Sequence, residues 1–187
     1  MLKTIVTIEN VKTNIRPISK HLDDNRINIY IDEAERLDLK PQLGESLFID
    51  LKEFINDVPA TERTSGKTFG TDYPDYDLLL TGGIYKKSES VYKEFAGLRT
   101  ALEYYVYARL VKNNNYTVTR FGFVNKEDQY SQQSDLKERL VSEKDARSIA
   151  DTYMNDCLEY IRMNSDQFKA FGCGKQKNRL RISIIGE

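Results

Sequence analysis

The sequence predicts a mainly α-helical fold, a small bundle of four or more helices with a β-like projecting segment and terminal strands. Four long segments carry apolar residues at helical spacing, whereas residues 115–127 alternate between apolar and polar side chains. Residues 59–75 are rich in Pro, Gly, Ser, Thr and Asp, which is typical of a long loop. With 187 residues, 30% charged and 40% apolar, the chain has the size and composition of a globular domain.

The first expected elements are a strand and a helix. Segment 2–8 is β-branched and predicts a strand, and the aspartates that open segment 23–39 are candidate caps of a helix. The apolar face of this helix consists of Ile27, Ile31 and Ala34. Pro41 is expected to end the helix, because proline cannot continue a helix that precedes it.

A second helix, 44–58, precedes the long loop. Its apolar face consists of Leu47, Leu51, Phe54 and Ile55. A short helix is expected after the loop, with Pro74 in its first turn and Gly82 or Gly83 in the left-handed position that ends it.

Segment 95–113 predicts a strong helix that is apolar on two sides. One face carries Leu98, Ala101, Leu102 and Tyr105, and the other carries Tyr104, Tyr107 and Val111. Such a helix is expected to be buried on both sides, in a core or between subunits.

The alternating segment 115–127 is the first candidate interface. It carries Tyr116, Phe121 and Phe123, and Gly122 is expected at a bulge or a close backbone approach. A two-stranded element standing alone is marginally stable in water, so we expect this segment to project from the bundle and contact a neighbouring subunit.

The longest helix is expected over residues 134–164. Its apolar stripe consists of Leu136, Leu140, Ala146, Ile149, Ala150, Tyr153, Met154, Cys157 and Ile161. The i,i+4 pairs Asp135–Arg139 and Glu143–Arg147 are expected on its solvated side.

The chain is expected to divide into a helical domain, 1–165, and a basic C-terminal extension, 166–187. The extension ends in a pattern with period two, which makes its residues the second candidate interface. These residues are Arg179, Leu180, Arg181, Ile182 and Ile184. An unpaired strand requires a partner, either a strand of another protein or residues 2–8 of the same chain.

One short motif, "TSGKT" at 64–68, resembles the end of a phosphate-binding loop. Such a loop needs an earlier glycine, where this chain has Thr61, and it needs a preceding strand, where this chain has a helix. "GCGK" at 172–175 fails the same test, since Lys169 stands at the first-glycine position. We therefore expect no nucleotide binding.

The remaining candidates for chemistry also favour structural roles. His21 is the single histidine, Asp72, Asp75 and Asp77 lack the order of a calcium loop, and Asp75 is better placed as a helix cap. Cys157 lies on an apolar helix face and Cys173 has no activating base beside it. We expect no catalytic residue, no metal and no cofactor. The net charge of −1 gives no general attraction to nucleic acid.

Localisation follows from three further features of the sequence. The start of the chain carries no signal-peptide pattern, and no apolar run approaches the length of a membrane span. The two cysteines are too few for a disulfide framework. We expect synthesis and folding in a cytoplasm, with no membrane partner.

Five stretches occur in an order that resembles a known family. They are "IDEAERLDLKPQLGESLF", "YDLLLTGGIY", "GLRTALEYYVYARLV", "TVTRFGFVNK" and "ADTYMNDCLEY". Over residues 23–165 this order is similar to that of the head–tail connector, or adaptor, proteins of tailed phages that infect Bacteroidetes, including crAss-like phages and related prophages.

The resemblance implies a structural virion protein without an active site. Its copies, commonly about twelve, would form a ring that joins the portal protein to tail or further neck proteins and continues the DNA exit channel. DNA would pass through without sequence-specific binding, and the protein would reside in the virion after synthesis in the bacterial cytoplasm. Two alternatives remain: an accessory protein of a mobile element that binds nucleic acid through its basic tail, and a small enzyme with the 59–77 loop as a lid.

Overall fold

The structure, a computed structural model, describes residues 3–19, 22–57, 75–113, 116–119, 122–125 and 136–171. The helices are α1 (Ile8–Thr13), α2 (Asp24–Ala34), the π-helix η1 (Glu35–Leu39), α3 (Lys40–Leu43), α4 (Glu45–Asp57), α5 (Tyr76–Thr81), α6 (Gly97–Asn113) and α7 (Leu136–Met163). Two separate antiparallel hairpins consist of β1 (Gly83–Ser88) with β2 (Val91–Phe95) and β3 (Tyr116–Thr119) with β4 (Gly122–Asn125). The predicted mainly α-helical fold is confirmed.

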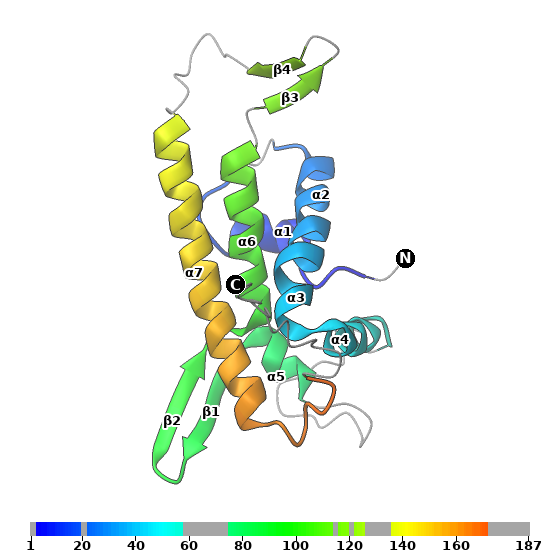
Figure 1. Cartoon of the computed structure of the whole chain (residues 1–187), viewed down its shortest axis with the longest axis vertical. Helices are drawn as coiled ribbons and strands as arrows, with labels where there is room; N and C mark the ends of the chain where they lie inside the picture. Colours follow the sequence, from blue (N-terminus) through cyan, green and yellow to red (C-terminus); the bar gives the residue numbers. More distant parts are fainter. Residues whose placement is uncertain are drawn as a thin grey trace, which may run out of the picture.

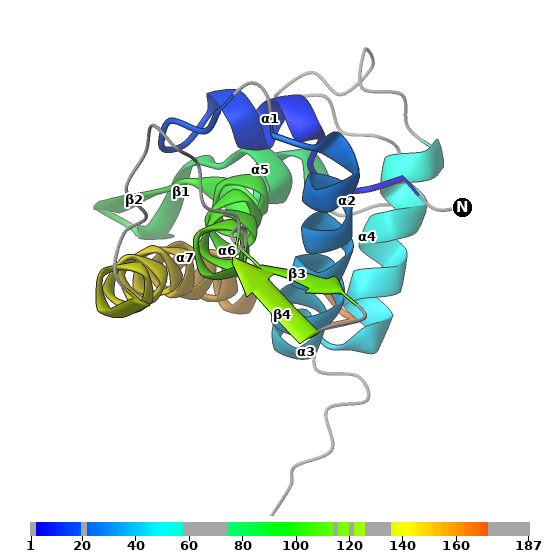
Figure 2. The same cartoon turned by 90° about the horizontal axis from the view of Figure 1, so that it is seen from above.

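Helix α6 is the centre of the bundle. It packs along α7 on one side and against α1, α2 and α5 on the others (Figures 1 and 2). Its buried face includes Leu98, Ala101, Leu102 and Tyr105, as expected. On the second face, Tyr104 is half-buried against Tyr153 of α7, with ring centroids 5.7 Å apart. The two-sided apolar pattern therefore marks the helix around which the core is built.

The chain from Asp23 to Gly44 is helical almost throughout. Asp23 caps α2 by accepting a hydrogen bond from the backbone N–H of Asn25, as the sequence indicated. The prediction that Pro41 ends the helix is wrong. Pro41 lies in the first turn of α3, where a missing N–H costs little, and the chain turns only at Gly44 with φ 85°.

Helix α4 confirms the second predicted helix. It buries Leu47, Leu51, Phe54 and Ile55 together, so the predicted face is the observed one.

The predicted N-terminal strand is wrong over its described part, residues 3–7. Ile5 and Val6 are buried in the core without joining a sheet. Thr7 then caps α1, because its side chain accepts from the N–H of Asn10 while the Asn10 side chain accepts from the N–H of Thr7. The β-branched residues here serve burial and capping rather than strand pairing.

Helix α7 confirms the predicted long helix but changes its register at the start. Ala146, Ala150, Met154 and Cys157 are buried as expected. The first turns of the helix differ from the prediction.

Leu136 and Leu140 are exposed, whereas Arg139 and Glu143 are buried. The expected apolar stripe is therefore wrong before Ala146, and so is the solvated placement of Arg139 and Glu143. The physical reason for the burial of Glu143 is that Arg147 pairs with its carboxylate and also with Asp38 of η1, which compensates the buried charge.

The bundle continues past the end of α7. Phe168 is buried, and its ring lies 5.8 Å from that of Tyr76 and 5.7 Å from that of Tyr160. Residues up to 171 therefore contribute to the core, beyond the expected boundary at 165.

Candidate functional site

The projecting segment predicted at 115–127 is a hairpin. Strands β3 and β4 pair from Tyr116 opposite Asn125 to Thr119 opposite Gly122, with Phe123 opposite Val118. Gly122 thus lies where β4 begins, next to the turn. Figure 1 shows the hairpin beyond the ends of α6 and α7, away from the bundle. Its projection is confirmed, and its contact with a neighbour stays a prediction.

Several other predicted residues lie outside the described residues. These are Phe121, His21, Asp72, Cys173, the loop with "TSGKT", and the tail residues Arg179, Leu180, Arg181, Ile182 and Ile184. The structure brings none of these residues into a described site, so their roles stay predictions.

A second hairpin, β1–β2, is fixed to α7 by ion pairs. The Nζ of Lys93 lies 2.7 Å from both Asp156 Oδ1 and Glu159 Oε2, and Lys87 Nζ lies 2.7 Å from Glu159 Oε1. Hydrogen bonds from Lys87 and Lys93 lower the pKa of Glu159 to about 2. The two carboxylates in turn raise the pKa of Lys93.

The same face of the hairpin is packed through aromatic rings. The ring of Tyr160 in α7 lies 5.2 Å from that of Tyr85 and 4.7 Å, nearly parallel, from that of Phe95. Tyr85 and Phe95 also meet edge to face at 5.7 Å. Ion pairs and aromatic packing on the same face therefore hold the hairpin against α7.

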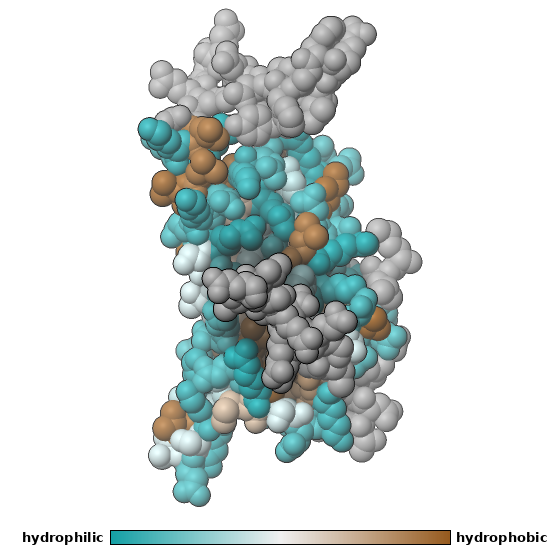
Figure 3. All heavy atoms as spheres, viewed as in Figure 1, coloured by the Kyte–Doolittle hydropathy of each residue, from teal (hydrophilic) through white to brown (hydrophobic). Residues whose placement is uncertain are grey.

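The opposite face of the hairpin is open to solvent. Cross-strand partners Ile84 with Glu94 and Lys86 with Tyr92 form it, and we call these four residues the hairpin face. Ile84 is 66% exposed and Tyr92 68% exposed. Figure 3 shows apolar atoms at the surface of the protruding hairpin. A rigid element with large exposed apolar side chains is suited to binding a protein surface.

The hairpin β1–β2 is the functional feature that sequence reasoning missed. Two short β-prone runs, around Tyr85 and Val91, flank the polar turn "SES" at 88–90. The four charged residues within these runs, three lysines and one glutamate, obscure the alternation of apolar and polar side chains. Their alternate arrangement, with Lys87 and Lys93 toward α7, depends on carboxylates that are distant in sequence.

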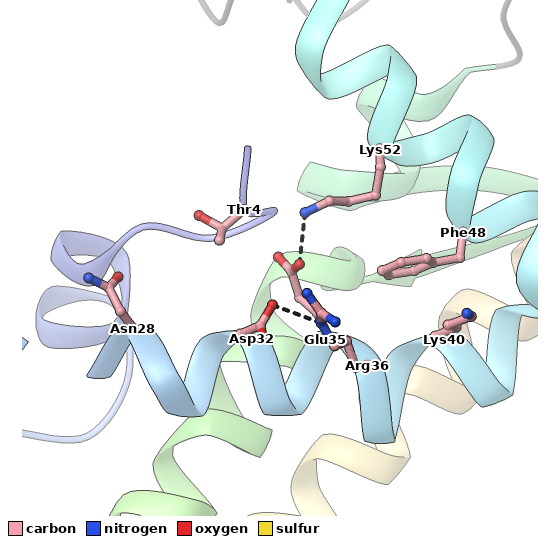
Figure 4. A pocket seen from close by; sticks show the side chains of 8 residues that line it. All are labelled: Thr4, Asn28, Asp32, Glu35, Arg36, Lys40, Phe48 and Lys52. Atoms are coloured by element: carbon pink, nitrogen blue, oxygen red, sulfur yellow. Dashed lines mark hydrogen bonds and ion pairs between the residues drawn. The ribbon is translucent and has the colours of Figure 1, made fainter. Parts of the chain in front are cut away.

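On the other side of α6, a pocket of 640 Å³ opens between the N-terminal segment, α2, η1 and α4 (Figure 4). It is lined by Thr4, Asn28, Asp32, Glu35, Arg36, Lys40, Phe48 and Lys52. Its three cations each have a carboxylate: Lys52 pairs with Glu35 at 2.8 Å, Arg36 with Asp32 at 2.9 Å and Lys40 with Glu45 at 2.7 Å. The pocket is therefore nearly neutral and offers no concentrated charge to an anionic ligand.

The π-helix η1 buries a second carboxylate, Asp38. Arg109 of α6 lies 2.6 Å from it and Arg147 of α7 lies 3.4 Å from it. Burial raises the pKa of Asp38, and the two arginines oppose that shift. Nearby, the Tyr105 hydroxyl donates to Asp151 at 2.5 Å and accepts from Gln42 Nε2 at 3.0 Å. These contacts tie η1, α3, α6 and α7 together.

Residues that could support catalysis or metal binding have structural roles where they are described. Asp75 caps α5 by accepting from the N–H of Leu78. Cys157 is fully buried, and burial raises its pKa to about 12, so its thiol remains protonated at neutral pH. Across the described ranges, no three His, Cys, Asp or Glu side chains are grouped to hold a metal ion. Nor does any described helix have the length and apolarity to cross a membrane.

Comparison with known proteins gives a family. No curated protein and no solved structure matches the chain. Residues 39–181, from the end of η1 to beyond α7, match the family described as "Family of unknown function (DUF6712)". The match covers most of the chain, including both hairpins, and the chain therefore belongs to the DUF6712 family.

Proposed function

We propose that this protein is the subunit of a homo-oligomeric ring, the head–tail connector of a tailed phage, which joins the portal to the tail. The observation that carries the proposal is the β1–β2 hairpin. Its inner face is fixed to α7 through Lys87, Lys93 and Tyr85, while its outer face exposes Ile84 and Tyr92. Fixing a hairpin in advance lowers the entropy lost on association, which suits repeated subunit contacts.

Two further features support the proposal. The ordered stretches that resemble connector proteins extend over the helical bundle, including the central helix α6. The β3–β4 hairpin projects at the opposite end of the molecule from β1–β2, so two different protruding elements are available for neighbours (Figure 1). Closing a ring makes the last contacts intramolecular, so modest individual interfaces suffice.

The proposal is tested by electron microscopy and mass measurement of the purified protein, alone and mixed with a phage portal protein. We expect closed rings of about twelve copies that bind coaxially to the portal. A protein that forms no ring in either condition contradicts the proposal. Duplex DNA binding that falls steeply with salt, without rings, would instead favour the nucleic-acid-binding alternative.

The enzyme alternative has a separate test. Addition of ATP or GTP with Mg²⁺ is expected to leave the melting temperature unchanged, because the "TSGKT" segment lacks the first glycine and the preceding strand of a phosphate-binding loop. A saturable rise of several degrees would contradict this expectation.

A further inference from the structure

A second exposed apolar surface lies on the helix formed by α2 and η1. Ile29, Glu33 and Arg36 follow one another at spacings of four and three residues, so they share one side of the helix, and Leu37 adjoins Arg36 at the edge of that side. We call these four residues the α2 stripe. Ile29 is 56% exposed and Leu37 63% exposed, on the side away from the buried Ile27, Ile31 and Ala34.

The hairpin face and the α2 stripe lie on different flanks of the molecule. Seen from above, β1–β2 is on one side of α6 and α2 on the other (Figure 2). Two such surfaces on one subunit cannot meet each other within the chain. They can meet between subunits in a head-to-tail arrangement, which closes into a ring when the rotation allows it.

The two surfaces are also complementary in composition. Each presents two large apolar side chains, one basic residue and one acidic residue. On the hairpin face, Lys86 and Glu94 stand on a cross-strand diagonal, which separates them by about 7–8 Å. On the α2 stripe, Glu33 and Arg36 are i,i+3 neighbours about 5–6 Å apart. The side chains of these charged residues are long enough to span the difference between the two separations. Lys86 can therefore face Glu33 while Glu94 faces Arg36.

The guanidinium of Arg36 retains capacity for this contact. Its Nε donates to Asp32 at 2.9 Å, yet the side chain is 67% exposed, and a guanidinium carries further N–H donors. The apolar residues would supply most of the affinity, while the charges would set the register of the two surfaces.

We infer that the hairpin face of one subunit docks on the α2 stripe of the next copy of this chain. The inference rests on the proposed ring and names the subunit contact that would build it. The occupant of each surface is thus a second copy, in a head-to-tail contact rather than a two-fold one.

The test uses two double variants of the full chain. Ile84→Ser with Tyr92→Ser removes the apolar part of the hairpin face, and Ile29→Ser with Leu37→Ser does the same for the α2 stripe. All four side chains are exposed, so both variants should keep the wild-type melting temperature. The control is Val141→Ser, which is 67% exposed and belongs to neither surface.

Analytical ultracentrifugation gives the expected result directly. Each double variant alone should remain monomeric where the wild type and Val141→Ser assemble, with the Kd of association raised about a hundredfold. An equimolar mixture should form a dimer and nothing larger, because one intact hairpin face and one intact α2 stripe remain. A charge reversal, Lys86→Glu, should raise the Kd about tenfold, and Glu33→Lys in the other partner should restore it.

Other outcomes overturn the inference in distinguishable ways. If both double variants form the same rings as the wild type, this contact is contradicted, but the proposed function is not. Self-association of the α2-stripe variant alone indicates a two-fold hairpin contact and also overturns the inference. A wild-type protein that stays monomeric at every concentration contradicts the docking itself. The test of ring formation with the portal protein then shows whether the proposed function holds.

Discussion

Two carboxylates, Glu35 and Asp38, are buried on the same short π-helix, and each meets basic side chains from other helices. A π-helix displaces the following residues relative to an α-helix and is often found at functional positions. Here it directs Glu35 toward Lys52 of α4 and Asp38 toward Arg109 of α6. Because a buried charge without its partner is costly, these pairs hold neighbouring helices in register.

The Glu35–Lys52 pair gives the first prediction. Lys52→Met should lower the free energy of unfolding by about 3–5 kcal/mol, since Glu35 would remain buried and unpaired. Adding Glu35→Gln should recover much of this loss, because a neutral amide can still accept the N–H of Ile5. Denaturant unfolding measures both. Lys40→Met is the control, because its pair with Glu45 is exposed to solvent and should contribute far less. A double variant as unstable as the single one would contradict the explanation.

The anchoring of β1–β2 gives a prediction of pH dependence. The pKa of Glu159 is lowered to about 2, so its stabilising effect is present above its ordinary value of 4.5 and is lost as the pH falls toward 2. Glu159→Gln should therefore lower the melting temperature at pH 7, and the difference from wild type should shrink toward pH 2. Calorimetry at several pH values measures it. Glu138→Gln, in the exposed first turn of α7, is the control. A constant Glu159 difference would argue against the ion pairs.

At the scale of elements, two glycines bring the end of α5 and the start of α6 into backbone contact. Gly82 has φ 79° and Gly97 has φ 83°, a region that favours glycine. A Cβ on Gly82 would overlap the backbone of Phe95 and Ala96, and one on Gly97 would overlap the backbone of Leu80 and Gly82. This crossing sets where β1 leaves the bundle and β2 returns to it.

The glycine crossing gives the third prediction. Gly97→Ala should cost about 1–3 kcal/mol for the backbone conformation alone, and more for the overlap with the backbone of Gly82. Thermal unfolding measures the loss. Because the crossing positions β1–β2, the variant should also assemble poorly even where it is folded. A variant as stable as the wild type would show that the end of α5 and the start of α6 can move apart without a loss of free energy.

The rotated start of α7 gives the fourth prediction. Leu136→Ala should change the free energy of unfolding by less than about 0.5 kcal/mol, because Leu136 is exposed. Met154→Ala, on the buried part of the same helix, should cost about 2–5 kcal/mol. Denaturant titration compares them. Equal losses of stability in the two variants would indicate that the buried apolar stripe begins at Leu136, as the sequence spacing predicts.

For the whole molecule, the described core and the predicted docking tail involve different parts of the chain. The core extends from Ile5 to Phe168 and includes residues from all the longer helices. The tail from residue 172 lies outside the described residues, so its predicted role in docking on the portal has to be tested separately.

Removal of residues 175–187 gives the fifth prediction. The truncated protein should keep the helical circular dichroism and melting temperature of the full chain, because the core formed by the described residues ends at Phe171, before the deletion begins. It should fail to bind the portal, since the alternating residues 179–184 are predicted to add a strand to the partner. Co-purification with portal measures this. Retained binding would contradict the docking role, and loss of folding would place the tail in the core.

Much of the fold could be predicted from local sequence. The spacing of Leu47, Leu51, Phe54 and Ile55 defines the buried face of α4, and the two-sided pattern of α6 marks the central helix. Asp23 and Asp75 are caps in the sequence and in the structure. These features depend on interactions within a few residues, which helical periodicity and capping preferences record directly.

The candidate binding surfaces were decided by tertiary structure. Lys87 and Lys93 fix the β1–β2 hairpin only because Asp156 and Glu159 of α7 lie beneath them. These two carboxylates follow Lys93 by more than sixty residues in the sequence. Glu143 is buried because Arg147 compensates its charge and in turn pairs with Asp38 of η1, whereas Leu136 on the same helix is exposed. Periodicity assumes that apolar side chains face the core, and it fails where distant charges compensate one another. The sequence by itself determined the longer helices and the core faces of α2, α4 and α6, whereas long-range ion pairs and the glycine crossing decided how β1–β2 and the start of α7 are placed.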